Sequence, residues 1–194
     1  MNFFKLSISV TAALFIILSQ QAFALGFLPK NQTENSKTPI TMQPKEVANT
    51  KRELDFNLAP IKNLGDLKAY LAITPIESSP LGSLTDVERE IFINSLVFTS
   101  KGLASFDYSV LNYGPTVTEV YSILALFGSQ SSISSIPNLT ITSELDSSIM
   151  AAAEMFQQRP VLNNYRCEQA YPFEYYWCYP RREKMCYEEI CYTL

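Results

Sequence analysis

The sequence contains no histidine, only six glycines, and no cysteine before residue 167. Without an imidazole, the side chains of this protein cannot form a Ser-His-Asp triad, a Cys-His dyad or a His-ligated zinc site. The few glycines leave little room for a phosphate-binding loop, and neither a G-x-S-x-G nor an H-E-x-x-H motif is present. These absences exclude the commonest hydrolase sites and give no sign of a cofactor or metal. We therefore expect a non-enzymatic protein.

A long apolar run occurs only near the start of the chain. Lys5 supplies one positive charge, residues 6–18 are mostly apolar, and Ala22-Phe23-Ala24 has the small-x-small pattern of a cleavage site. The run is shorter than the roughly 20 residues that span a bilayer. We interpret residues 1–24 as a secretory signal peptide. The remaining chain is then expected to be periplasmic or secreted, without a transmembrane segment.

Composition and charge divide the rest of the chain into three segments. Residues 25–60 are rich in Lys, Thr, Asn, Gln and Pro and poor in large apolar residues, which predicts a flexible leader. Residues 61–160 are expected to form a helical core domain, whose net charge is −7 over residues 63–158. Such an acidic surface repels phosphate backbones, so nucleic acid is not an expected partner. Residues 161–194 hold every cysteine and are expected to form a separate module.

Helix-start patterns predict where the helices of the 61–160 core domain begin. Thr85 with Glu88, and Thr116 with Glu119, each match a capping box, in which a Thr hydroxyl and a Glu carboxylate bond to each other's backbone amides. A third helix is predicted to begin after Ser143.

The first of these helices is expected to end near Ser95, and the composition that follows predicts a short β-hairpin around Lys101. The second is expected to end before Gly128, which suits a left-handed C-terminal residue. We therefore predict an α+β fold. It comprises a small, mainly helical domain with a short hairpin, followed by a disulfide-stapled, β-rich C-terminal module.

The cysteines of this module have a C-x10-C-x7-C-x4-C spacing, without a C-x2-C pair that would indicate a zinc ribbon or a redox motif. Behind a signal peptide, they are expected to form two disulfides, and three connectivities stay open. Residues 174–179 and 184–188 have strand-like composition, which predicts a hairpin with its turn at 180–183. The residues concerned are Cys167, Cys178, Cys186 and Cys191.

Aromatic side chains are concentrated in the same module, with nine in the last thirty residues. Tyr, Trp and Arg dominate binding hot spots because they combine contact area with directed donors. Burial of the aromatics against the module's own disulfides is the alternative interpretation. Six side chains are candidates for contact with a protein or glycan partner: Tyr175, Tyr176, Trp177, Tyr179, Arg181 and Arg182.

Two other functions stay open beside the exported binding module. Cysteines confined to the tail are typical of a precursor that releases a secreted Cys-rich peptide or toxin, although no dibasic site lies near the start of the tail. A carboxylate-dependent hydrolase would need a pair of acidic side chains. The candidate pairs are Glu88 with Glu90 and Asp107 with Glu119. Glu88 and Glu119 are already explained as helix caps, however, and Asp107 suits the cap of the segment that begins at Tyr108.

Overall fold

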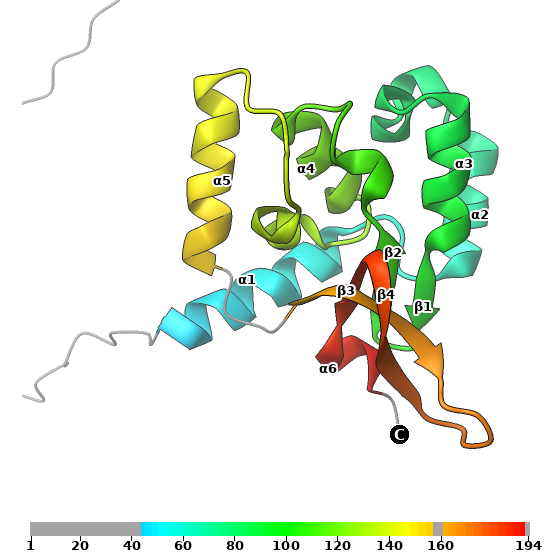
Figure 1. Ribbon diagram of the computed structural model, residues 1–194. Coiled ribbons are helices and arrows are strands. Elements are labelled where there is room, and N and C mark those ends of the chain that lie inside the picture. Colours follow the sequence, from blue (N-terminus) through cyan, green and yellow to red (C-terminus); the bar gives the residue numbers. More distant parts are fainter. Residues whose placement is uncertain (1–43, 157–160, 193–194) are drawn as a thin grey trace, which may run out of the picture. The chain divides into compact units, whose positions relative to one another are not determined.

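The computed structural model describes residues 44–156 and 161–192, which belong to one compact unit. The predicted signal peptide, residues 1–24, and residues 25–43 of the predicted leader lie outside the described residues. The α-helices are α1 (Pro44–Leu58), α2 (Leu64–Ile73), α3 (Asp86–Ser95), α4 (Val117–Ala125), α5 (Glu144–Phe156) and α6 (Glu188–Cys191) (Figure 1). Short 3-10 helices lie between them: η1 (Ile76–Ser78), η2 (Pro80–Ser83), η3 (Ser109–Leu111) and η4 (Gln130–Ser135).

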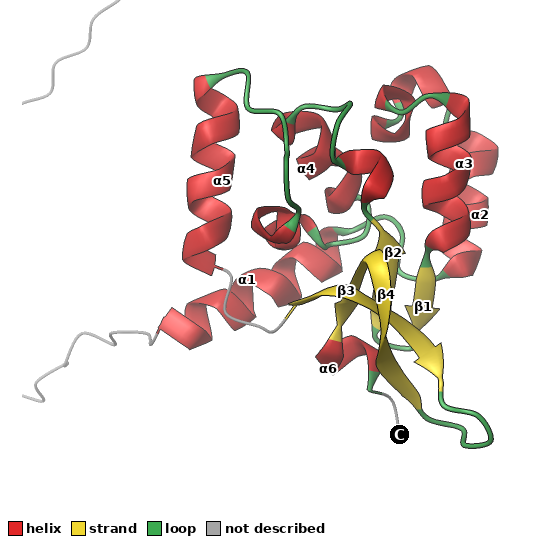
Figure 2. Ribbon diagram, in the orientation of Figure 1, coloured by secondary structure: helices red, strands yellow, loops and turns green. Residues whose placement is uncertain are grey.

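One antiparallel sheet combines strands from both halves of the described chain (Figure 2). Its strands are β1 (Val97–Thr99), β2 (Gly102–Asp107), β3 (Val161–Gln169) and β4 (Tyr176–Tyr187), in the spatial order β1-β2-β4-β3. The predicted α+β fold is confirmed. Since β4 pairs with β2, the predicted helical domain and the predicted C-terminal module share this sheet.

Both predicted capping boxes are present. The Thr85 and Thr116 hydroxyls accept the N–H groups of Glu88 and Glu119, whose carboxylates accept the threonine N–H groups in return. The helix that starts after Thr85 ends at residue 95, and the β1–β2 hairpin follows it as expected. Gly128, which follows α4, has a φ of +68°. These starts and stops are predictable because each depends on residues a few positions apart.

Residues 44–58 are helical, so the prediction of a flexible leader over 25–60 is wrong for this part. Helix α1 is held by contacts with residues that are distant in sequence. Its Phe56 ring and backbone lie against two glycines with positive φ, Gly102 and Gly128. A Cβ atom on either glycine would lie 2.7 Å from an atom of Phe56. Average composition could not reveal this docking, because it depends on two backbone positions without side chains.

The main core lies between helices α2–α5 and the sheet. Phe92 from α3 contacts Phe106 from β2 and Phe127 edge-to-face, with ring centroids 5.8 and 6.0 Å apart. All three rings are buried. Strand β2 is buried along its whole length, because a second apolar cluster, formed by Ala104 and the four cysteines, covers it as well. Leu103 and Phe106 belong to the main core.

The predicted hairpin within residues 174–188 is wrong in its turn. Residues 176–187 form one strand, β4, and its hairpin partner is β3. The expected turn at 180–183 lies in a bulge, where the β3–β4 register shifts and both Asn164 and Glu183 take positive φ values. The Glu183 N–H donates to Asn164 Oδ1 at 3.0 Å, and its carbonyl oxygen accepts the Tyr108 N–H at 2.9 Å. Bonds to two neighbouring segments therefore hold the bulge.

Candidate functional site

The β3–β4 hairpin carries most of the candidate contact residues. Its strands pair as far as Gln169 opposite Tyr176, and residues 170–175 connect them. The Ala170 N–H donates to the Tyr175 carbonyl oxygen at 2.9 Å, which closes the base of this connection. Ala170 is buried, whereas residues 171–175 are all exposed. The turn therefore extends into solvent beyond a closed base (Figure 2).

Four large aromatic side chains on this hairpin face solvent, and we call them the aromatic tip: Tyr171, Phe173, Tyr175 and Trp177. Their exposed fractions are 95%, 57%, 40% and 48%. Phe173 and Tyr175 stack with ring centroids 5.4 Å apart, and Trp177 stacks on Tyr192 at 4.1 Å. Stacking restricts the orientations of the rings. Three of the four exposed rings, those of Phe173, Tyr175 and Trp177, are therefore restricted by stacking.

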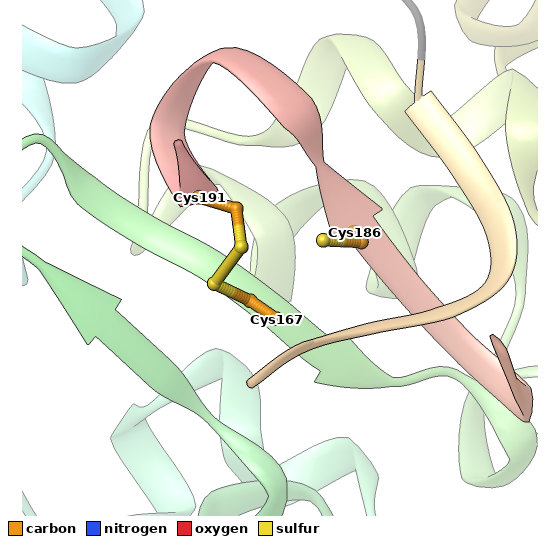
Figure 3. Close-up of side chains that lie close together, drawn as sticks. All are labelled: Cys167, Cys186 and Cys191. Atoms are coloured by element: carbon orange, nitrogen blue, oxygen red, sulfur yellow. A yellow bond between two sulfur atoms is a disulfide. The ribbon is translucent and has the colours of Figure 1, made fainter. Parts of the chain in front are cut away.

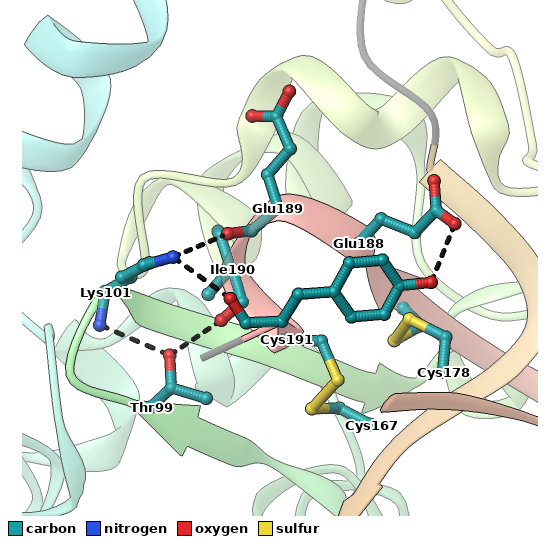
Figure 4. Close-up of a disulfide and its surroundings, with 10 residues drawn as sticks. Thr99, Lys101, Cys167, Cys178, Glu188, Glu189, Ile190 and Cys191 are labelled. Atoms are coloured by element: carbon teal, nitrogen blue, oxygen red, sulfur yellow. Dashed lines mark hydrogen bonds between the residues drawn. A yellow bond between two sulfur atoms is a disulfide. The ribbon is translucent and has the colours of Figure 1, made fainter. Parts of the chain in front are cut away.

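Tyr192 supports the inner end of the tip. Its hydroxyl donates to Glu188 Oε1 at 2.9 Å. Burial, together with this hydrogen bond, raises the pKa of Tyr192 to about 12. Its carbonyl oxygen accepts a hydrogen bond from Lys101 Nζ at 3.1 Å (Figure 4). Trp177 therefore stacks on an uncharged ring that is held at its hydroxyl and at its backbone.

The β1–β2 turn also holds helix α6. Lys101 Nζ donates to the Glu189 carbonyl oxygen at 3.3 Å, and Thr99 Oγ1 donates to the Ile190 carbonyl oxygen at 3.0 Å (Figure 4). These oxygens belong to the last residues of a four-residue helix, where carbonyl groups lack helical partners. The end of the described chain is thus attached to the edge of the sheet.

Two disulfides lie beneath the hairpin, as predicted. Cys167–Cys191 links β3 to α6, and Cys178–Cys186 links two parts of β4. Although they belong to different disulfides, the Sγ atoms of Cys167, Cys186 and Cys191 lie within 4.8 Å of one another (Figure 3). As disulfides these atoms are not thiolates, which are the form that ligates metals. Such bonds are compatible with an exported protein.

The Cys178–Cys186 bond explains the course of β4. These residues are eight positions apart, a separation of about 26 Å in an extended strand. Their Cα atoms are 5.9 Å apart. Strand β4 therefore bends sharply at its bulge, and the disulfide closes the inside of the bend.

The four aromatic candidates do not share one environment. Tyr175 and Trp177 belong to the aromatic tip. Tyr176 is half-buried and packs against the cysteine cluster. Tyr179 is also half-buried and lies opposite Arg166 in the sheet register. The structure thus combines the two interpretations of the sequence, since Tyr175 and Trp177 face solvent and Tyr176 covers the disulfides.

The two arginine candidates lie in the bulge of β4. Arg181 Nε and Nη2 donate to the two carboxylate oxygens of Glu168, each at 2.9 Å. This bidentate pair connects β4 to β3 and fixes the direction of the guanidinium group. Arg182 is exposed. Arg181 therefore has a structural partner on the hairpin.

Sequence reasoning missed Tyr171 and Phe173, the two members of the tip that lie in the turn. A pattern in the sequence could have found them, because every odd-numbered residue from 171 to 179 is aromatic. Alternation with a period of two is typical of side chains on one face of an extended chain.

The acidic residues considered for a hydrolase mostly have structural roles. Glu88 and Glu119 complete the two capping boxes. Asp107, which is 6% exposed, forms a salt bridge with Lys184. Glu90 is exposed on α3. Three of the four carboxylates are therefore engaged in holding the fold.

Within the described residues, no helix combines the length and apolar character needed to cross a bilayer. Comparison with protein-family models, curated proteins and solved structures found no match.

Proposed function

We propose that this chain is an exported, non-enzymatic protein that binds a protein partner through its aromatic tip. The observation that carries the proposal is the exposure of four large aromatic side chains on one hairpin that two disulfides hold to the fold. Aromatic residues are enriched at interface hot spots and depleted on ordinary surfaces. The cost of exposing them is best explained by a partner that covers them.

The shape of the tip favours a protein over a glycan. Its most exposed ring, that of Tyr171, has an exposed fraction of 95%, and the hairpin turn extends past the sheet. Sites for small ligands are usually concave and place several polar groups around the bound molecule. A protruding aromatic side chain instead suits insertion into a pocket of a partner protein. We therefore expect the partner to supply the concave surface.

The hairpin is also constrained before it meets a partner. Cys167–Cys191, Cys178–Cys186 and the Arg181–Glu168 ion pair all join segments that flank the tip. Binding by a constrained segment loses less conformational entropy than binding by a loop that must become ordered.

Charge indicates which partners are not expected. The segment 63–158 is strongly acidic, so phosphate backbones of nucleic acid are repelled. The segment 159–194 has no net charge. Apolar contact, and not long-range electrostatic attraction, is thus expected to dominate recognition by the tip.

The first experiment identifies the partner. A photo-crosslinking amino acid is placed at position 171 in the full chain, and the matched control carries it at position 113, where Tyr113 is also exposed at 77%. After irradiation with extracellular material from the native host, we expect one protein to crosslink from position 171 and not from position 113. Equal crosslinking from both positions, or crosslinking from neither, would overturn the proposal.

The second experiment measures the contact with the purified partner. Trp177→Ala is expected to weaken binding about 30-fold, as for a hot-spot residue, whereas Tyr113→Ala leaves the affinity unchanged. Circular dichroism checks that both variants fold. Full affinity of Trp177→Ala for the partner would contradict a protein-binding tip. Displacement of the partner by an isolated glycan would contradict it as well.

A further inference from the structure

A cavity of about 480 Å³ lies between helix α1, the β1–β2 hairpin and helix α6. Residues 127–129, which follow α4, and Tyr187 at the end of β4 also line it. An apolar cavity of about 150 Å³ is large enough to hold benzene. The cavity beside α1 is about three times as large, so it has room for an aromatic ring together with a charged group of several atoms.

The apolar part of the lining comes from four different segments. It consists of Phe56 from α1, Leu103 from β2, Phe127 and Ile190 from α6. Leu103 and Phe127 belong to the main core, so their positions are fixed by packing. An apolar group that covers these side chains removes their surface from water, which favours binding.

Arg52 brings a partly buried positive charge to the cavity. Its side chain is 30% exposed, and burial lowers the pKa of its guanidinium group. A guanidinium group has five N–H donors. In the described part of the chain, Arg52 uses one of them, in a 3.3 Å bond from Nη2 to Glu189 Oε2. Since a charge that loses hydration needs partners, the remaining donors suit a carboxylate in the cavity.

The other charged residues of the lining balance this charge. Lys101 Nζ donates two hydrogen bonds to backbone carbonyl oxygens, and Glu189 pairs with Arg52. Glu53 is exposed and attracts the Arg52 guanidinium electrostatically, but within the described residues its carboxylate has no hydrogen-bond donor. The lining therefore holds two positive and two negative side chains. Arg52 and Glu53 are the two that keep most of their capacity for hydrogen bonds.

Three hydroxyl groups in the lining carry no charge. They belong to Ser129, Ser131 and Tyr187. The Tyr187 hydroxyl is already hydrogen-bonded to the Ser132 hydroxyl at 2.7 Å. Because hydroxyl groups both donate and accept, they do not favour a ligand of either charge. The charged side chains therefore decide which ligand fits.

From this combination we infer that the cavity binds a small zwitterion with an apolar side chain, of the α-amino acid class. Its carboxylate accepts hydrogen bonds from Arg52, its ammonium group donates to Glu53, and its side chain packs against the rings of the apolar lining. A ligand with a carboxylate alone would bring a negative charge close to Glu53 and Glu189 without a compensating contact. The inference goes beyond the proposed function and does not depend on it, since none of the four side chains of the aromatic tip lines this cavity.

Three compounds of similar size test the need for both charges. L-phenylalanine has a carboxylate and an ammonium group, phenylpropanoate lacks the ammonium group, and phenethylamine lacks the carboxylate. We expect the full chain to bind L-phenylalanine about tenfold more tightly than either of the others, as for one charge-assisted hydrogen bond. Calorimetry measures the affinities, and NMR shifts of the Gly128 and Ser129 amides show that the compound lies in this cavity.

Two variants assign each charge of the ligand to its partner. Arg52→Gln is expected to weaken binding of L-phenylalanine and of phenylpropanoate about tenfold while the affinity for phenethylamine stays unchanged. Glu53→Gln is expected to have the opposite selectivity, because it removes the partner of the ammonium group. Lys68→Gln removes an exposed charge on α2, outside the cavity, and serves as the matched control. Thermal melting checks the fold of each variant.

Three results would overturn the inference. The first is binding of phenylpropanoate or phenethylamine as tight as that of L-phenylalanine, because one charge would then suffice. The second is the absence of binding of L-phenylalanine to the unmodified chain up to the limit of solubility. The third is full affinity for L-phenylalanine in a folded Arg52→Gln or Glu53→Gln variant, which would place the compound elsewhere.

Discussion

Asp146, at the start of α5, accepts two hydrogen bonds from Thr118 at the start of α4. One carboxylate oxygen accepts the Thr118 hydroxyl at 2.7 Å and its backbone N–H at 2.9 Å. The other accepts the Thr142 hydroxyl and N–H and the Ser143 N–H, at 2.9–3.0 Å. Asp146 is 1% exposed. These bonds hold the pKa of the Asp146 carboxyl well below its ordinary value of 3.8, and the bond from the Thr118 hydroxyl has the largest effect.

Asp146→Asn is therefore expected to lower the melting temperature at pH 7, because an amide group would face N–H donors. A carboxyl group whose pKa is lower in the folded state stabilises the fold above its unfolded pKa and loses this effect as pH falls. The difference between the variant and the unmodified chain should thus shrink below about pH 4. Thermal melts at pH 7 and pH 3 measure it, with Glu144→Gln as the exposed control on the same helix. A constant difference at both pH values would contradict this role.

Substitution of one cysteine of the Cys178–Cys186 bond leaves its partner as a free thiol. Whether this thiol exchanges with the Cys167–Cys191 disulfide should depend on which of the two cysteines remains. In Cys178→Ser, the Cys186 thiolate lies within 4.8 Å of both sulfurs of the Cys167–Cys191 bond. It attacks one of them, a new disulfide forms, and the other sulfur leaves as a thiolate. Peptide mapping under non-reducing conditions should therefore detect Cys186 linked to Cys167 or Cys191.

The matched variant is Cys186→Ser, which frees Cys178. Cys178 is not part of the group of three neighbouring sulfurs. We expect the Cys167–Cys191 bond to persist in this variant, with a free thiol at Cys178. Equal rearrangement in both variants would show that the spacing of the sulfurs does not direct the exchange.

The docking of α1 against two glycines predicts that Phe56→Ala restores stability to the Gly102→Ala variant and not to the Gly128→Ala variant. Gly102→Ala places a Cβ 2.7 Å from the Phe56 ring, whereas Gly128→Ala places one 2.7 Å from the Phe56 backbone. Each single variant should lose about 1–3 kcal/mol of stability, since both glycines also have positive φ. Adding Phe56→Ala removes the clash at Gly102 and not the clash at Gly128.

A double-mutant cycle in urea measures this difference. Hydrogen exchange of residues 44–58 reports separately whether α1 stays docked. Equal coupling of Phe56→Ala to both glycine variants would contradict the contacts described for α1.

Tyr187 predicts a loss of stability in alkaline solution. Its hydroxyl is hydrogen-bonded to Ser132 at 2.7 Å, and burial raises its pKa to about 12. Above about pH 10 the unfolded chain loses this proton more readily than the folded chain, so stability falls towards pH 12. Tyr187→Phe should reduce this slope, measured by urea unfolding between pH 9 and pH 12. Tyr192, whose pKa is also about 12, accounts for a remaining slope. An unchanged slope in Tyr187→Phe would contradict the burial of this hydroxyl.

Local patterns explain which parts of the fold could be predicted. The capping residues Thr85 and Thr116 act on amides within the same turn, so four consecutive residues contain the necessary information. The position of α1 depends on Gly102 and Gly128, and the bend of β4 depends on Asn164 and Tyr108. These partners are far away in sequence, so their effect appears only in the folded chain.

The candidate site, too, could be predicted from the sequence only in part. The abundance of aromatics in the tail points to the correct segment, because composition is a local property. Whether a given ring faces solvent depends on strand register. Tyr176 and Trp177 are neighbours in sequence, yet one covers the cysteines and the other is 48% exposed. The pairing of β3 with β4 decides between them, and this pairing involves residues on both sides of the turn.

The bond between Cys167 and Cys191 closes a covalent ring of the main chain that contains the whole aromatic tip. If an extracellular protease hydrolyses one peptide bond in the exposed turn, both pieces stay joined through this disulfide. The mass then increases by one water molecule, and two chains separate only after reduction. A tip that meets proteases can thus be cut once without being shed.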